Sequence, residues 1–166
     1  MNSAPTTTLP QSTSVYEFLI FSKTGSCLYH LDFTGTINFD KAHDKNGDVH
    51  QRQKLVFGLL WSIKSFSIMV TIIFPFIIFK LSTKPLQCFR NYSTAKYKFH
   101  IYELPTGLKL VLITSPLRPD QFETLQKLYQ TLYVPLVSRN YFCTPNHKIK
   151  CKLFQEKVSE FLIANV

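Results

Sequence analysis

The chain has 166 residues, enough for one domain that buries roughly two-thirds of its unfolded surface. Apolar residues make up 45% of it and charged residues 17%, with 15 Phe and 8 Tyr, which excludes a disordered or low-complexity protein. Lysine and arginine outnumber aspartate and glutamate by 19 to 10, a formal charge of +9. An electrostatic partner should therefore be acidic: a nucleic acid, an anionic membrane or an acidic protein.

The N-terminal residues and the cysteines favour a reduced, cytoplasmic protein. Residues 1–14 carry neither charge nor an apolar core, so we interpret them as a flexible tail and not as a signal peptide. The four cysteines form no CxxC pair. Cys143, His147 and Cys151 are spaced four apart, but Pro145 disrupts a helix there and a fourth ligand is missing. No metal or other cofactor is expected.

A β-hairpin is predicted to open the domain, followed by a loop. Residues 15–21 and 26–33 are rich in aromatic and β-branched residues, and a turn that ends in Gly25 separates them. Residues 34–47 are polar and rich in turn formers, which predicts a loop. Asp48 and Gln51 have the spacing of a capping box that would start the next helix.

That helix is predicted to have two unlike faces. Apolar residues recur at about 100° per residue and should face the core; they are Val49, Val56, Leu59, Leu60, Ile63 and Phe66. The opposite face carries Gln51, Lys54, Gly58, Trp61 and Ser65. Either another part of the chain covers this tryptophan, or a partner docks there, since aromatic residues dominate interface hot spots.

An uncharged, apolar run, Ser65–Phe79, follows. As a helix it would cover about 22 Å, short of a ~30 Å hydrocarbon core, and extending it backwards brings in Lys64. Its β-branched residues and Pro75 disfavour a regular helix. A membrane-anchored protein that spans through residues 59–79 is therefore the alternative hypothesis and not the leading one.

The second half of the chain predicts two strands and two helices. Residues 96–103 alternate as in a half-buried strand, with Lys96, Lys98, His100 and Tyr102 on the polar side, and residues 108–114 form the return strand. Asp120 and Glu123 make a second capping box, which opens a helix with an apolar stripe of Phe122, Leu125, Tyr129, Leu132 and Leu136. Pro135 should kink or end that helix. A last helix begins near Lys148 and faces inward with Cys151, Phe154, Val158, Phe161 and Leu162.

Strands and helices are segregated in this order, which predicts an α+β fold in which helices pack on an antiparallel sheet. The glycines fit neither a P-loop nor a dinucleotide fingerprint, and no nucleophile elbow or zinc-protease motif is present. The basic run from Lys80 to Lys98 lacks any RNA-binding signature, and solvated lysines explain it more simply. We therefore expect neither an enzyme nor a nucleic-acid-binding protein.

Three stretches resemble one family closely. Residues 54–66 (KLVFGLLWSIKSF), 93–111 (STAKYKFHIYELPTGLKLV) and 125–143 (LQKLYQTLYVPLVSRNYFC), together with Gly25 and Cys27 of the hairpin, look like the TRAPP complex subunit 1 family, the small Bet-five-like subunits of the transport protein particle. The resemblance covers most of residues 15–160. Pro135 replaces a residue that is usually charged in the family, and an apolar insertion, residues 67–79, separates two elements that are nearly adjacent in it.

The resemblance implies a longin-like (sedlin/SNARE-like) fold, a five-stranded antiparallel sheet with one helix on one face and two on the other. The additional strand should come from about Leu86–Tyr92. It also implies a single domain, residues 15–166, and a non-catalytic core subunit of a vesicle-tethering complex. That complex is an exchange factor for a Rab GTPase in endoplasmic reticulum to Golgi transport. The expected partners are sister subunits, the GTPase through the assembly, and anionic membrane at the endoplasmic reticulum and cis-Golgi.

Overall fold

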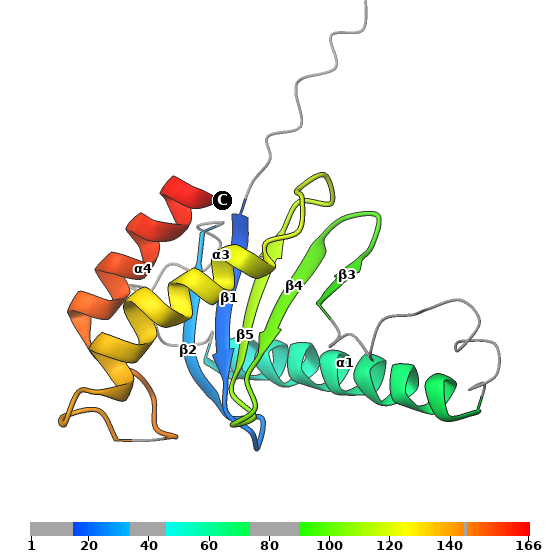
Figure 1. Ribbon diagram of the computed structural model, residues 1–166, viewed down its shortest axis with the longest axis horizontal. Helices are drawn as coiled ribbons and strands as arrows, with labels where there is room; N and C mark the ends of the chain where they lie inside the picture. Colours follow the sequence, from blue (N-terminus) through cyan, green and yellow to red (C-terminus); the bar gives the residue numbers. More distant parts are fainter. Residues whose placement is uncertain (1–14, 34–45, 74–89, 145) are drawn as a thin grey trace, which may run out of the picture.

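Five antiparallel strands form one sheet in the order β2-β1-β5-β4-β3 (Figure 1). The strands are β1 (Val15–Phe21), β2 (Cys27–Asp32), β3 (Asn91–Ser93), β4 (Lys98–Glu103) and β5 (Lys109–Thr114). This computed structural model describes residues 15–33, 46–73, 90–144 and 146–166. The expected tail at residues 1–14 and most of the expected loop at 34–47 lie outside them. The predicted α+β class and five-stranded sheet are confirmed.

The helices cover both faces of the sheet. They are α1 (Asn46–Ile73), α3 (Phe122–Leu128), its continuation η1 (Tyr129–Ser138) and α4 (Lys152–Asn165). Alternate residues of the central strands point to opposite faces. Phe18 and Leu112 join the core beneath α3, η1 and α4, whereas Leu19 and Val111 join the core beneath α1. One helix therefore packs on one face and the α3–η1 and α4 pair on the other.

Burial on both faces corrects the prediction for β4. His100 was expected on a solvated side of a half-buried strand, but its side chain is fully buried (0% exposed) beneath the segment that leads into α3. Phe99 and Ile101 face the core under α1, as expected. Both sides of β4 are covered. The alternating residues of this strand therefore face two different cores, and neither side is a solvent face.

Three predictions for α1 are wrong. The helix begins at Asn46, so Asp48 lies inside it and does not cap it. The helix also continues to Ile73, through residues 67–73 of the run that was expected to be irregular. Phe66, which was placed on the inner face, is 65% exposed. The remainder of the apolar run, residues 74–79, lies outside the described residues.

Pro135 does not end the helix. The helix continues through it, but as a π-helix and not as an α-helix. A proline ring clashes with the carbonyl four residues earlier and donates no hydrogen bond. From Tyr129 to Ser138 the helix widens into π turns, and the Arg139 N–H donates to the Val134 carbonyl five residues earlier, at 2.9 Å. The wider turn accommodates the proline, as π segments do elsewhere inside helices.

The starts of the last two helices also differ from the prediction. α3 begins at Phe122 after Gln121 and has no side-chain cap, so Asp120 and Glu123 form no capping box. α4 begins at Lys152, four residues after the expected start. The predicted inward stripe of α4 is confirmed, because Phe154, Val158 and Leu162 are fully buried and Cys151 and Phe161 pack against the same core.

Two hairpin turns depend on glycine. Gly25 and Gly107 have φ of +89° and +87°, a conformation that side chains with a Cβ rarely adopt. A Cβ on Gly25 would also lie 2.6 Å from the ring of Phe57. The β1–β2 turn therefore packs directly on α1, which fixes the angle of this helix across the sheet.

Candidate functional site

Buried charge attaches the start of α1 to the sheet. Glu17 on β1 is 2% exposed, and its carboxylate is paired with the guanidinium of Arg52 on α1. The other carboxylate oxygen lies 3.2 Å from His30 Nε2 on β2. Gln53 Nε2 lies 3.4 Å from Nδ1 of the same histidine. Glu17 thus joins two strands and the helix in one polar cluster.

A second ion pair attaches the middle of α1. Lys64 Nζ donates to both carboxylate oxygens of Glu103 at the end of β4, at 2.8 and 2.7 Å. Lys109 on β5 lies 3.5 Å from the same carboxylate. Between the two polar clusters, Val56 and Leu60 are buried and Phe57 packs on Phe21. The orientation of α1 is therefore fixed by three independent contacts with the sheet.

The predicted partner-binding residues lie on the side of α1 away from the sheet. Gln51, Lys54, Gly58 and Trp61 are exposed and Ser65 is half-buried. Trp61 is 63% exposed, so the described part of the chain does not cover it. The hypothesis that another part of the same chain covers Trp61 is therefore not supported by the described residues.

The same outer face carries apolar side chains that the sequence reasoning missed. Exposed large apolar residues of α1 are Leu55, Phe66, Ile68 and Met69, in addition to Trp61. At 100° per residue, Leu55, Phe66 and Met69 lie on one side of Gly58 and Ser65, and Trp61 and Ile68 lie on the other. Exposed large apolar side chains therefore lie on both sides of Gly58 and Ser65 on this face.

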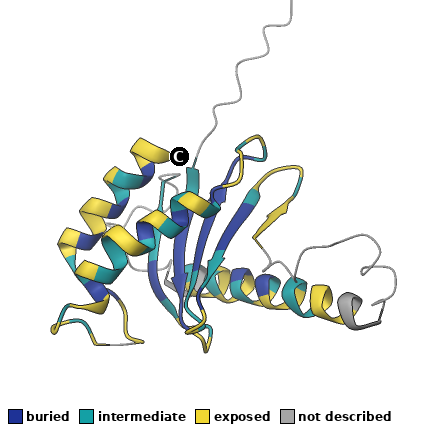
Figure 2. Cartoon of the chain, viewed as in Figure 1, coloured by how far each residue is buried: buried dark blue, intermediate teal, exposed yellow. Residues whose placement is uncertain are grey.

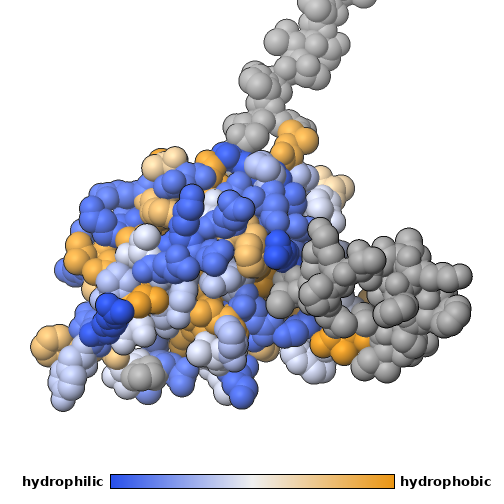
Figure 3. Space-filling model, viewed as in Figure 1, coloured by the Kyte–Doolittle hydropathy of each residue, from blue (hydrophilic) through white to orange (hydrophobic). Residues whose placement is uncertain are grey.

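Open space above Gly58 completes this geometry. A Cβ added there would meet nothing within 4 Å. By contrast, the outer surface over α3 and α4 is largely hydrophilic (Figure 3). A group of five exposed large apolar side chains on one helix is typical of a protein interaction site.

A groove of about 660 Å³ borders this face. It lies between α1, the β1–β2 turn and the segment before α4, and none of the described residues that line it is acidic. Its polar lining includes Lys54, Lys148, His50 and Gln53. Cys27 also lines it, and burial raises the pKa of its thiol to about 11, so this thiol is not an activated nucleophile.

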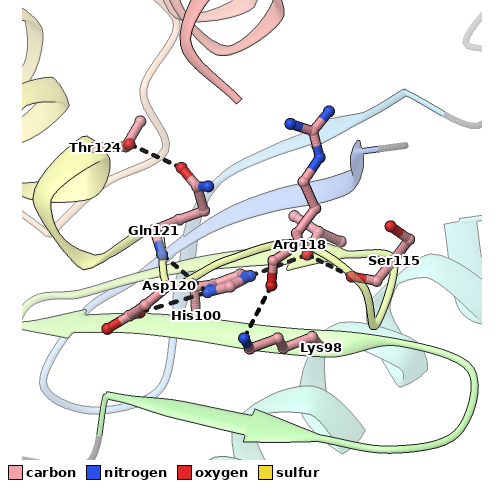
Figure 4. A network of polar contacts seen from close by, with 8 residues as sticks. Lys98, His100, Ser115, Arg118, Asp120, Gln121 and Thr124 are labelled. Atoms are coloured by element: carbon pink, nitrogen blue, oxygen red, sulfur yellow. Dashed lines mark hydrogen bonds and ion pairs between the residues drawn. The ribbon is translucent and has the colours of Figure 1, made fainter. Parts of the chain in front are cut away.

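A buried polar network lies on the opposite side of the sheet (Figure 4). The Gln121 N–H donates to His100 Nδ1 at 3.2 Å, and His100 Nε2 lies 2.9 Å from Thr114 Oγ1. Thr114 Oγ1 donates to the Ser115 carbonyl, so it accepts from Nε2 and the ring is the neutral Nε2–H tautomer. Burial, with Lys98 nearby, lowers the pKa of His100 to about 4. The network holds the entry to α3 against β4.

Neither a metal centre nor a membrane span is found in the part of the chain that the structure describes. No group of three or more histidine, cysteine or acidic side chains there is arranged to hold a metal ion. None of the described helices has the length and apolar character needed to cross a bilayer. The alternative of a span through residues 59–79 thus gains no support, and Lys64 within it is bound to the sheet.

The family follows from comparison with known proteins. A family model described as the Sybindin-like family matches residues 15–165. The chain belongs to the Sybindin-like family. The resemblance to TRAPP complex subunit 1 is confirmed by curated relatives. The chain is 30% identical to the trafficking protein particle complex subunit 1 of Dictyostelium discoideum, over 89% of this chain and 94% of that protein.

Two further Sybindin-like relatives agree. The transport protein particle subunit bet5 of Schizosaccharomyces pombe is 28% identical, over 90% of this chain and 96% of its own length. The human trafficking protein particle complex subunit 1 is 27% identical, over 90% and 92%. Because the similarity extends over nearly the whole of each relative, it concerns the complete domain and not a shared fragment.

Proposed function

We propose that the chain is a non-catalytic core subunit of a TRAPP vesicle-tethering complex. The observation that carries this proposal is the end-to-end similarity to three proteins that are named as subunits of the trafficking protein particle. The described side chains support a binding role, because the histidine and the cysteine with a shifted pKa, His100 and Cys27, are a buried neutral imidazole and a protonated thiol. Neither has the exposure or charge state of a catalytic group.

The outer face of α1 is the proposed contact with a sister subunit, through Gln51, Lys54, Gly58, Trp61 and Ser65. A helix of the partner would lie over Gly58 and Ser65, where small side chains permit close approach of two backbones. Leu55, Trp61 and Phe66 would then be buried on its two sides. Aromatic anchors next to apolar surface are the usual centres of such interfaces.

The finer parts of the proposal concern the assembly. The complex would act as nucleotide exchange factor for a Rab GTPase in endoplasmic reticulum to Golgi transport, on the cytoplasmic side and peripherally at these membranes. The excess of positive charge suits work beside anionic lipid. The proposal also divides the chain into a tail (1–14) and one domain (15–166) with an apolar insertion at residues 67–79. No cofactor and no nucleic acid take part.

Trp61→Ala should weaken binding to the sister subunit about 30-fold, as loss of a hot-spot aromatic costs about 2 kcal/mol. Gly58→Leu should weaken it as well, because the added side chain occupies the space that the partner needs, while the fold of this chain tolerates it. Co-purification of the complex, followed by titration of the purified subunits, measures both effects. Ile163→Ala is the matched control, since this residue is equally apolar and exposed but lies on α4. Normal assembly of both α1 variants would contradict the proposed docking face.

The isolated chain should not accelerate GDP release from the GTPase, whereas the complex that contains it should. No described residue offers a means to displace a nucleotide or its magnesium ion, and the proposed role is structural. Release of a fluorescent GDP analogue can be followed with the pure chain, the complete complex and the complex lacking this subunit. Stimulation by the pure chain alone would show that the subunit is itself the exchange factor.

A further inference from the structure

The loop that joins η1 to α4 presents two adjacent aromatic side chains to solvent. Tyr141 is 97% exposed and Phe142 92%, the highest values among the large apolar residues that the structure describes. The two rings stack edge to face, with centroids 6.1 Å apart. This loop lies at the end of the molecule opposite the C-terminus (Figure 1) and is largely exposed (Figure 2).

Hydrogen bonds hold this part of the loop in shape. The Phe142 N–H donates to Asn140 Oδ1 at 3.0 Å, and Asn140 Nδ2 donates to the Leu136 carbonyl at 3.2 Å. The Cys143 N–H donates to the Asn140 carbonyl at 3.0 Å. A defined turn thus keeps both aromatic rings away from the core, although apolar surface of this kind is usually covered by a partner.

In the sequence, basic residues lie on both sides of the aromatic pair, and the same stretch contains no acidic residue. No aspartate or glutamate occurs between Glu123 and Glu156. Exposed basic residues in this stretch include Arg139 just before the pair, and Lys148, Lys150 and Lys152 on the returning part of the loop. Ile149 is buried and its N–H donates to the Leu28 carbonyl of β2, so Lys148 and Lys150 are held at the surface on either side of it.

We propose that this basic-aromatic tip (Arg139, Tyr141, Phe142, Lys148, Lys150 and Lys152) docks the chain on an anionic phospholipid surface. The phenol of Tyr141 enters the headgroup region, where an aromatic side chain with one polar end is stable. The phenyl ring of Phe142 enters the boundary between headgroups and acyl chains. The ammonium and guanidinium groups contact lipid phosphates and carboxylates. The inference deepens the proposed function, on which it rests for the presence of the protein beside a membrane.

The composition of the tip favours lipid over a protein partner. Lysine is depleted in protein–protein interfaces, whereas an anionic leaflet attracts each lysine near its surface. The aromatic side chains also stand at the end of a loop and not within a broad apolar face such as the one on α1. The two surfaces are therefore suited to different partners, α1 to a sister subunit and the tip to the bilayer.

Vesicle co-sedimentation of the full chain tests the inference. Binding should require anionic lipid, so it is compared on vesicles of phosphatidylcholine alone and with about 30% phosphatidylserine. Replacing Tyr141 and Phe142 together by serine should reduce binding about tenfold or more, because their apolar area no longer leaves water. Replacing Lys148 and Lys150 by alanine should reduce it about 30-fold and should weaken its dependence on salt, of which Arg139 and Lys152 retain a part.

Matched controls separate the tip from general charge and from the α1 face. Lys96→Ala with Lys127→Ala removes the same charge from exposed positions elsewhere and should leave binding within about twofold. Trp61→Ala should bind vesicles normally, even if it no longer assembles with a sister subunit. Unchanged thermal unfolding of the tip variants shows that they are folded.

Two outcomes would overturn the inference. One is equal binding to vesicles with and without phosphatidylserine. The other is normal vesicle binding by the serine variant, together with reduced co-purification of another subunit, which would assign the tip to a protein interface. Neither outcome affects the proposed role of α1, which the co-purification of the Trp61 and Gly58 variants tests separately.

Discussion

Arg52→Ala should destabilise the domain by about 3 kcal/mol, although the arginine side chain is itself more than half exposed. The loss arises at its partner. Glu17 is 2% exposed, and without the guanidinium the ion-pair partner left to its carboxylate among the described residues is His30. An ionised group that is buried without adequate compensation costs several kcal/mol. Urea unfolding at neutral pH measures the change.

A double-mutant cycle shows whether the buried charge is the cause. Residue 17 lies on the same face of β1 as Leu19 and Phe21. Glu17→Leu should therefore fit beneath α1 and, combined with Arg52→Ala, recover most of the lost stability. The coupling energy between the two sites should be about 2 kcal/mol. If Arg52→Ala alone costs less than about 0.5 kcal/mol, as an exposed ion pair does, water reaches Glu17 and the explanation is wrong.

The sequence predicted four of the strands and the inward stripe of α4 because these depend on local periodicity. The fifth strand, β3, was expected only from the resemblance, at about Leu86–Tyr92, and lies at Asn91–Ser93. Val15–Phe21 and residues 108–114 show as strands in their aromatic and β-branched composition, and Phe154, Val158 and Leu162 fall on one side of a helix at any plausible starting residue. Helix starts were less predictable, because the polar residues of an expected capping box can form other contacts instead. Asp120, for example, lies 3.7 Å from His100 Nδ1 instead of capping α3.

Contacts between distant segments could not be predicted in the same way. Arg52 and Glu17 are 35 positions apart, and Lys64 and Glu103 are 39 apart, so no local pattern reveals either pair. Alternation in β4 was read as one buried and one solvated face, but a second layer of helices covers the other face and buries His100. The number of layers over a strand is a property of the whole fold.

For the candidate site, the sequence located the helix face but not its extent. Trp61 and Gly58 opposite the apolar stripe were sufficient to choose the side of α1 that the structure leaves exposed. Phe66 was assigned to the core because it continues the apolar period, yet it lies at the edge of the stripe, where α1 has passed its last anchor on the sheet at Lys64. Leu55 was assigned to neither face.

The stability of the domain should fall as the pH is lowered from about 6.5 to about 4, through His100. Its pKa in the folded state is about 4, below the ordinary value of 6.5, chiefly because of burial, with Lys98 acting in the same direction and Asp120 opposing it. Between these two pH values the unfolded chain binds a proton that the folded chain does not, so protons favour unfolding. A difference of about 2.5 units corresponds to about 3 kcal/mol. Below pH 4 both states are protonated and the loss levels off.

His100→Gln provides the comparison that isolates this residue. Glutamine cannot both accept from the Gln121 N–H and donate to Thr114 Oγ1 as the ring does, so the variant should be less stable by about 2 kcal/mol at pH 7, where the histidine is neutral in both states. Contributions from groups remote from residue 100 are common to both proteins and cancel in the difference. The gap in unfolding free energy should therefore narrow as the pH falls below 6.5, and reverse or vanish near 4. A gap that stays constant from pH 7 to 4 would mean that His100 accepts its proton without leaving the network, and that the N–H of Gln121 does not depend on the unprotonated Nδ1.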